Sequence, residues 1–234
     1  MNPKQLVKTL ISKPLDYFGY KILRKPKYLQ LNVSYGWIAH FLYFKEIYDL
    51  VKDLKGDIVE CGVGYGHSFF KLCCLAYYEN KGRKVYGFDS FQGFPEPSNE
   101  DRSPRNPQKG DWDVATVETI EKLLTEAGRI DSQFIDNNVK LVKGFFEESL
   151  NMFGGESIAI LHLDVDLYKS YKVALEYFWP MVEKGGVVLF DEYKQPEVMK
   201  YFPGASKAID EFFGSLVNQI QYNKNVNRYY IVKQ

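Results

Sequence analysis

The chain has 234 residues, and its 30 lysines and arginines balance its 30 aspartates and glutamates, so its formal net charge is zero. This balance argues against a nucleic-acid partner, and no apolar run approaches the roughly 20 residues that a transmembrane helix needs. The three cysteines, Cys61, Cys73 and Cys74, lack CxxC spacing and fit a reducing compartment. We therefore expect a cytoplasmic protein with one sizeable domain and no integral membrane segment.

Residues 1–35 are strongly basic, with seven lysines and arginines but a single acid, Asp16. We interpret them as a basic N-terminal arm that presents a solvated face, and we predict that the folded domain spans residues 36–234. Binding of this arm to a membrane surface or to an anionic partner is the alternative.

The domain is predicted to begin with a helix, which is followed by a strand–helix–strand unit. Apolar residues recur at helical spacing from Trp37 to Leu54. The β-branched run 57–61 predicts a strand, residues 68–78 return to helical character, and residues 84–88 predict a second strand that stops at Asp89. Such a unit implies that its two strands pair in parallel.

A long loop is predicted from Phe91 to Asp113, because this stretch contains four prolines and many polar residues. It follows the end of a strand, where long loops often cover a binding site, so we interpret it as a lid. The elements expected beyond it are a helix (114–127), a strand (139–143), a short helix (145–152), a buried strand (158–164), a helix (168–183), a strand (187–191), a helix (206–213) and two strands (218–223 and 227–233). This alternation predicts a Rossmann-like, doubly wound, mostly parallel sheet with an antiparallel C-terminal edge.

A glycine-rich turn follows the first strand, in the segment ECGVGYG (60–66). In open α/β sheets, ligands bind at the carboxyl ends of the strands. The spacing is GxGxG rather than the GxGxxG of dinucleotide sites, and Glu60 would repel a pyrophosphate but favour a cationic amino-acid end. Asp89, at the end of the second strand, can accept hydrogen bonds from both hydroxyls of a ribose. Together these features indicate an S-adenosylmethionine site rather than an NAD site.

The residues that we expect to contact this cofactor lie in the turn, at the second strand end and after the third strand. They are Glu60, Gly62, Gly64, Tyr65, Gly66, Ser68, Asp89, Ser90, Phe91, Gly144 and Phe145.

Four acids follow the next two strands: Asp164, Asp166, Asp191 and Glu192. Carboxylates gathered at one rim repel each other unless they are protonated or neutralised, and hard oxygen ligands select ions such as Mg²⁺ or Mn²⁺. Asp166 stands two residues before a predicted helix and is interpreted as its N-cap. We predict that Asp164, Asp191 and Glu192 bind a divalent metal ion.

The sequence resembles the macrocin O-methyltransferase family, whose members methylate sugar hydroxyls of macrolides and related glycosides. The resemblance is carried by VECGVGYG (59–66), YGFDSFQGFPEP (86–97), LHLDVDLYKS (161–170), KGGVVLFDEY (184–193) and KAIDEFF (207–213). It implies that the positions of Asp164, Asp191 and Glu192 hold the metal ion. The chain departs from the family at Glu192, where an aspartate is usual.

These observations lead to a hypothesis of metal-assisted methyl transfer from S-adenosylmethionine to a hydroxyl of a sugar or glycoside. The metal would chelate two vicinal hydroxyls and lower the pKa of the acceptor. Asp164 is the candidate base, with Lys169 a weaker candidate, and His162 is interpreted as a hydrogen-bonded core residue. The alternatives are a catechol-type or other small-molecule diol acceptor, a non-catalytic S-adenosylmethionine-binding protein and an NAD-dependent oxidoreductase. A homo-oligomer is also expected.

Overall fold

The computed structural model describes residues 33–234. The predicted basic arm, residues 1–35, lies outside this part of the chain except for its last three residues. Within residues 33–234, no helix combines the length and the apolar character that crossing a membrane requires.

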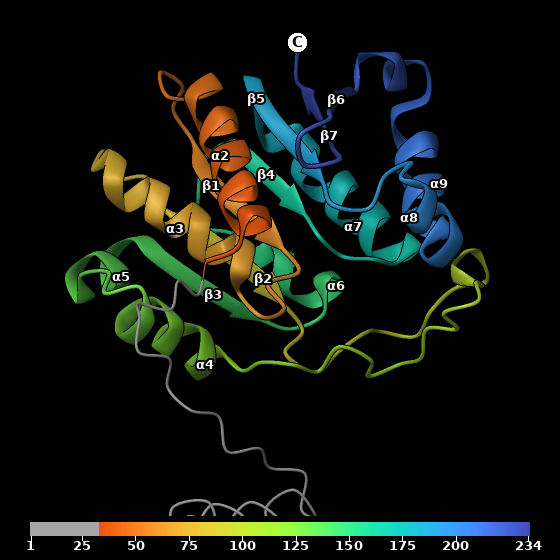
Figure 1. Ribbon diagram of the computed structural model, residues 1–234, viewed down its shortest axis with the longest axis horizontal. Helices are drawn as coiled ribbons and strands as arrows, with labels where there is room; N and C mark the ends of the chain where they lie inside the picture. Colours follow the sequence, from red (N-terminus) through yellow and green to blue (C-terminus); the bar gives the residue numbers. More distant parts are fainter. Residues whose placement is uncertain (1–32) are drawn as a thin grey trace, which may run out of the picture. The chain divides into compact units, whose positions relative to one another are not determined.

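The domain is built on a seven-stranded sheet with the order β3-β2-β1-β4-β5-β7-β6. The strands are β1 (Asp57–Cys61), β2 (Val85–Asp89), β3 (Val139–Lys143), β4 (Ile158–Leu163), β5 (Val182–Phe190), β6 (Gln221–Asn223) and β7 (Arg228–Val232). The first five pair in parallel, whereas β7 runs antiparallel to both β5 and β6. This topology confirms the predicted fold class (Figure 1).

The strand order reverses between β1 and β4. From β1 the chain proceeds to β2 and β3 on one side, then returns to place β4 and β5 on the other side. Loops that leave neighbouring strands in opposite directions open a crevice at their carboxyl ends, which is where ligands bind in such sheets. The order of the strands therefore positions a site between the ends of β1 and β4.

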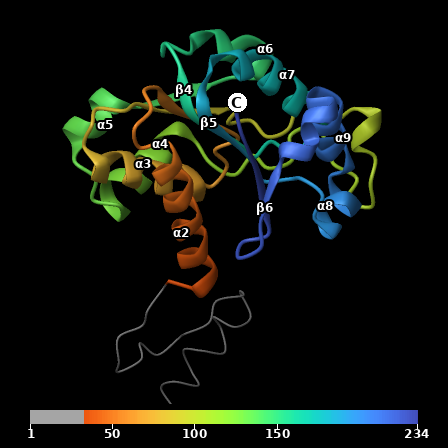
Figure 2. The ribbon, with the colours of Figure 1, turned by 90° about the horizontal axis from the view of Figure 1, so that it is seen from above.

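Helices cover both faces of the sheet (Figure 2). Helices α2, α3, α4 and α5 contribute side chains to the hydrophobic cluster on one face, and α6, α7 and α9 contribute to the cluster on the other. The helices are α2 (Tyr35–Leu50), α3 (His67–Glu79), α4 (Val117–Lys122), α5 (Ser132–Asn138), α6 (Phe146–Ser149), α7 (Tyr168–Phe178), α8 (Pro196–Tyr201) and α9 (Pro203–Phe213).

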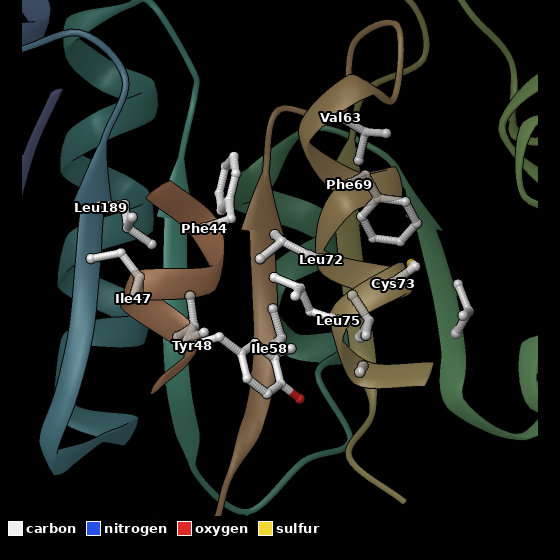
Figure 3. Packing of buried hydrophobic residues seen from close by; sticks show 14 of the residues in the cluster. Phe44, Ile47, Tyr48, Ile58, Val63, Phe69, Leu72, Cys73, Leu75 and Leu189 are labelled. Carbon is white, nitrogen blue, oxygen red and sulfur yellow. The ribbon is translucent and has the colours of Figure 1, made fainter. Parts of the chain in front are cut away.

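The core beneath α2 and α3 is made of almost completely buried side chains. Phe44 and Ile47 of α2 pack towards Leu189 of β5, while Phe69 and Leu72 of α3 pack over β1 and β2 (Figure 3). All five side chains are at most 3% exposed. Burying one such side chain stabilises the fold by roughly 1.5–3 kcal/mol, so this packing fixes the strand ends that carry the polar residues.

Several predicted boundaries are wrong. The helix expected over 168–183 ends at Phe178, because Pro180 cannot continue it, and β5 starts at Val182 rather than 187. The helix expected over 114–127 is α-helical only to Lys122 and π-helical from Leu123 to Ala127.

Two helices, α5 and α8, were not predicted at all. A signal for α5 was present in the sequence, since the Asp131 carboxylate caps it by accepting hydrogen bonds from the backbone N–H groups of Gln133 and Phe134. The signal for α8 was Pro196 in its first turn.

Candidate active site

A cavity of about 820 Å³ lies at the carboxyl ends of the parallel strands. Its volume is in the range typical of small-molecule sites. Its lining comes from the glycine turn after β1, the ends of β2, β4 and β5, the proline-rich loop (91–113) and the start of β7. The cavity thus occupies the crevice that the strand order creates.

The glycine turn needs its glycines for two different reasons. Gly62, at φ +84°, passes so close to the next strand end that an added Cβ would lie 1.8 Å from the backbone oxygen of Asp164. Gly64, at φ +50°, would project a Cβ into open space, with no atom within 4 Å. Gly62 therefore permits contact between two strand ends, whereas Gly64 keeps part of the cavity free for a ligand.

Asp89 holds the glycine turn in place. Its Oδ2 accepts hydrogen bonds from the backbone N–H groups of Val63 (2.9 Å) and Gly64 (3.0 Å), and its Oδ1 accepts one from that of Phe91 (2.7 Å). A carboxylate has about four lone-pair sites, so Asp89 can still accept a bond from a ligand in the cavity. Its predicted contact with a ribose stays a prediction.

Eight of the residues predicted to contact the cofactor line the cavity: Gly62, Gly64, Tyr65, Ser68, Asp89, Ser90, Gly144 and Phe145. Glu60, Gly66 and Phe91 do not line it. The Phe91 side chain packs in the core cluster, and the space beside Gly66 is filled by Ile120 and Leu123.

Side chains alternate between the two faces of the sheet along β1, and Glu60 points to the face that α2 covers. It is fully buried, and its Oε1 lies 2.8 Å from Nδ1 of His162. The ring of His162 makes an edge contact with Phe44 of α2. The expectation that His162 is a hydrogen-bonded core residue is confirmed. The predicted contact of Glu60 with the cofactor stays a prediction.

The three predicted metal ligands do come together. Asp164, Asp191 and Glu192 each offer a carboxylate oxygen, and these oxygens lie within 4.8 Å of one another. Burial, reinforced by the charge of Asp191, raises the pKa of Asp164. Burial and the charge of Asp164 likewise raise the pKa of Glu192. The cluster therefore favours either protons or a cation.

Asp191 is the one of these three predicted metal ligands that has a cationic partner. Burial alone would raise its pKa, but Arg228 and then His162 outweigh burial and lower it. Arg228 comes from β7, whose antiparallel pairing sets Tyr229 opposite Phe190, the residue before Asp191. Among the described residues that line the cavity, Arg228 is the only lysine or arginine. Sequence analysis missed it because the register of β7 is not visible in the sequence.

Glu192 is held by hydrogen bonds to one of its carboxylate oxygens. Oε2 accepts a bond from the hydroxyl of Tyr171 (2.8 Å) and a longer one from the backbone N–H of Asp166 (3.2 Å). The side chain is 5% exposed. The longer arm of a glutamate is thus fixed against α7, which compensates for its extra rotatable bond.

Asp166 is not the cap of α7, so that prediction is wrong. The N-cap position is Leu167, and the backbone of Asp166 is left-handed, with φ +57°. The acceptor for the N–H of Tyr168 is instead the carboxylate of Asp101, 67 residues earlier in the chain. Asp166 consequently lines the cavity.

Other residues of the cavity wall were not named by the sequence analysis. They include Trp112 of the proline-rich loop, which is 49% exposed and meets the ring of Tyr65 edge-on. They also include Gln195, whose amide donates to the backbone oxygens of Asp191 (3.1 Å) and Asn227 (2.9 Å). Exposed aromatic residues beside buried polar groups are typical of a surface that binds an organic ligand.

The fold and the cavity together define a class I methyltransferase fold. The solved calicheamicin methyltransferase CalS11 aligns with a TM-score of 0.77 at 23% identity, over 99% of this chain and 93% of that chain. Residues 44–213 match the family described as Macrocin-O-methyltransferase (TylF). The chain belongs to this family, as its sequence motifs predicted.

Two curated relatives support the assignment. One relative comes from Streptomyces olivaceus and is 31% identical over 62% of this chain and 55% of its own length. It is 8-demethyl-8-(2,3-dimethoxy-alpha-L-rhamnosyl)-tetracenomycin-C 4′-O-methyltransferase. Mycinamicin III 3″-O-methyltransferase from Micromonospora griseorubida is 27% identical over 61% of this chain and 57% of its own length. The chain thus spans little more than half the length of these relatives.

Proposed function

We propose that the chain transfers the methyl group of S-adenosylmethionine to a hydroxyl of a sugar or glycoside, with the help of a divalent metal ion. The observation that carries this proposal is the meeting of three carboxylate oxygens, within 4.8 Å of one another, in the same cavity as the glycine turn. Family membership and the names of the relatives, which methylate sugar-bearing natural products, support the choice of acceptor.

The glycine turn suits the sulfonium cofactor. Gly64 leaves open space beside its Cα, and Asp89 keeps acceptor capacity towards the cavity. Tyr65, which is 54% exposed, and Phe145 offer aromatic surface for an adenine ring. No lysine or arginine lies near this end among the described lining residues, which fits a ligand without phosphates better than NAD.

The carboxylate cluster suits a hard divalent cation. Asp164, Asp191 and Glu192 would hold it through oxygen, the ligand type that Mg²⁺ and Mn²⁺ prefer. When bound, such an ion supplies Lewis-acid polarisation and a template for a diol. Asp164 also lines the cavity in which the acceptor would bind, so we retain it as the candidate base.

The test is a methyl-transfer assay with S-adenosylmethionine and a simple methyl 6-deoxyhexopyranoside that has vicinal hydroxyls. We expect turnover that EDTA abolishes and Mg²⁺ restores. The variant Asp191→Asn should lose this turnover, whereas the control Asp49→Asn should keep it. Asp49 is an exposed acid of α2 that pairs with Lys45. Turnover of a catechol in place of the glycoside would support the alternative acceptor, and turnover unaffected by EDTA would contradict the role of the metal.

A further inference from the structure

The proline-rich loop is attached to the helices beside the cavity through one buried carboxylate. Asp101, 3% exposed, accepts a hydrogen bond from the backbone N–H of Tyr168 at Oδ1 (2.8 Å). Its Oδ2 accepts bonds from the backbone N–H (2.7 Å) and the hydroxyl (2.8 Å) of Ser98. One side chain therefore stabilises a turn of the loop and the first turn of α7 together.

A glycine next to Asp101 leaves room for its carboxylate. Gly204, in the first turn of α9, would place a Cβ 2.1 Å from Asp101 Oδ1, so any other residue there would displace the carboxylate. Figure 1 shows the yellow-green loop reaching the ends of α8 and α9 before it returns to α4. A negative charge at the start of α7 also interacts favourably with the positive end of the helix dipole. The loop, α7 and α9 thus meet at this carboxylate.

Further contacts fix the same part of the loop. The hydroxyl of Ser103 donates to the backbone oxygen of Tyr201 (2.8 Å). The guanidinium of Arg105 lies between the rings of Phe94 and Phe202, at 5.2 and 5.1 Å from their centroids. Both rings line the cavity. The middle of the loop is therefore fixed against α8 and against two rings that line the cavity.

The helix that Asp101 caps begins directly after the turn that carries the acidic residues. Because Asp101 supplies the acceptor for Tyr168, Asp166 is released from the capping role and adopts a left-handed backbone conformation. In that conformation its N–H donates to Oε2 of Glu192 (3.2 Å). A chain of contacts thus runs from the loop, through the start of α7, to Glu192, one of the three carboxylates of the cluster.

We infer that Asp101 is a positioning residue, which couples the docking of the proline-rich loop to the arrangement of Glu192. This inference rests on the proposed function, because Glu192 is one of its proposed metal ligands. A cap with a merely structural role would change stability and leave metal affinity alone. A positioning residue changes metal affinity as well, in the way that outer partners of metal ligands do.

The experiment compares Asp101→Ala, Asp101→Asn and the control Glu100→Ala in the full chain. Glu100 is the neighbouring acid, and its contact is an exposed ion pair with Lys207 (3.2 Å). Three quantities are measured without turnover. Calorimetry gives the Kd of Mn²⁺ and the Kd of S-adenosylhomocysteine, and proteolysis gives the rate of tryptic cleavage after Arg102, Arg105 and Lys109.

For Asp101→Ala we expect Mn²⁺ to bind about tenfold more weakly, with faster cleavage of the loop and an unchanged Kd for S-adenosylhomocysteine. Asp101→Asn should lie between Ala and the native residue, because its amide oxygen still accepts from Tyr168. Glu100→Ala should behave as the native protein. If Asp101→Ala does not fold, Asp101→Asn carries the comparison and must itself weaken Mn²⁺ binding severalfold.

Native Mn²⁺ affinity in Asp101→Ala, or an equal loss in Glu100→Ala, overturns the inference and leaves the proposed function standing. A native protein that binds no Mn²⁺ contradicts the metal in the proposed function itself. In that case the cleavage rates still decide whether Asp101 docks the loop, so the two failures are distinguishable.

Discussion

Arg228 binds both carboxylate oxygens of Asp191: its Nε lies 2.7 Å from Oδ1 and its Nη2 lies 3.1 Å from Oδ2. This two-point contact joins β7, at the antiparallel edge, to the end of β5. The other carboxylates around it, Asp164, Asp166 and Glu192, have raised pKa values. Arg228 is therefore the positive charge that the acidic cluster contains when no metal ion is bound.

Arg228→Ala should destabilise the fold, and Mg²⁺ should restore part of the loss. Both side chains of the pair are 24% exposed, so we expect a loss of about 2 kcal/mol, between the values for exposed and buried ion pairs. The bound ion would replace the missing positive charge. Thermal unfolding in EDTA and in saturating Mg²⁺ should thus show a larger gain from Mg²⁺ in Arg228→Ala than in the native protein.

The control for this comparison is Lys194→Ala. Lys194 pairs with Asp210 at 3.1 Å, and neither residue lines the cavity. An equal gain from Mg²⁺ in all three proteins would refute the view that Arg228 and the metal neutralise the same carboxylates.

Gly64→Ala should weaken cofactor binding while the protein still folds. The new Cβ meets no protein atom within 4 Å, so the cost to folding is the strain of a left-handed residue, about 1 kcal/mol. The methyl group would occupy space that we assign to the cofactor, and we expect the Kd of S-adenosylhomocysteine to rise by at least about tenfold, which corresponds to ~1.4 kcal/mol.

Gly82 provides a matched comparison for Gly64. It also has a positive φ, +76°, with no atom within 4 Å of an added Cβ, but it does not line the cavity. Gly82→Ala should show a similar loss of stability and a native Kd in the same calorimetric titration. If Gly64→Ala binds S-adenosylhomocysteine as well as Gly82→Ala does, the cofactor does not lie against this turn.

Asp166→Asn should stabilise the metal-free protein more at pH 8 than at pH 5. Burial, opposed by the charge of Arg105, raises the pKa of Asp166 to about 7, against about 3.9 in the unfolded chain. Between these values the folded state binds more protons, so stability falls as the pH rises from about 4 to about 7. An amide removes this loss, and we expect a gain at pH 8 on the order of 1 kcal/mol, reduced for partial exposure.

Urea unfolding in EDTA at the two pH values measures this difference. Asp49→Asn, at an exposed acid of α2, is the control for the loss of one carboxylate. A gain in Asp166→Asn that does not depend on pH would mean that the ionisation of Asp166 has no part in it.

The parts of the site that the sequence predicted are those that depend on local pattern. Asp164, Asp191 and Glu192 follow nearly continuous apolar strands, and parallel strands place such ends side by side. The glycine turn was also identified, because its residues are adjacent in the chain. The doubly wound, mostly parallel sheet and the approximate strand positions followed from the alternation of apolar runs with helical patterns.

The parts that the sequence did not predict depend on contacts between distant residues. Asp166 has the local pattern of an N-cap, yet Asp101 takes that role through a bond that spans 67 residues. Arg228 reaches Asp191 only through the register of β7. Glu60 was assigned to the cofactor from its spacing to the glycines, although the alternation of side chains on β1 turns it towards His162.

The most direct test of the central claim is a titration of the protein, saturated with S-adenosylhomocysteine, with Mn²⁺ monitored by electron paramagnetic resonance. We predict one tightly bound ion per chain, whose affinity falls by more than about 100-fold in both Asp164→Asn and Asp191→Asn and is unchanged in Asp210→Asn, an acid outside the cavity lining. Tight binding that survives both substitutions, or no tight binding in the native protein, would contradict a metal ion held by Asp164, Asp191 and Glu192.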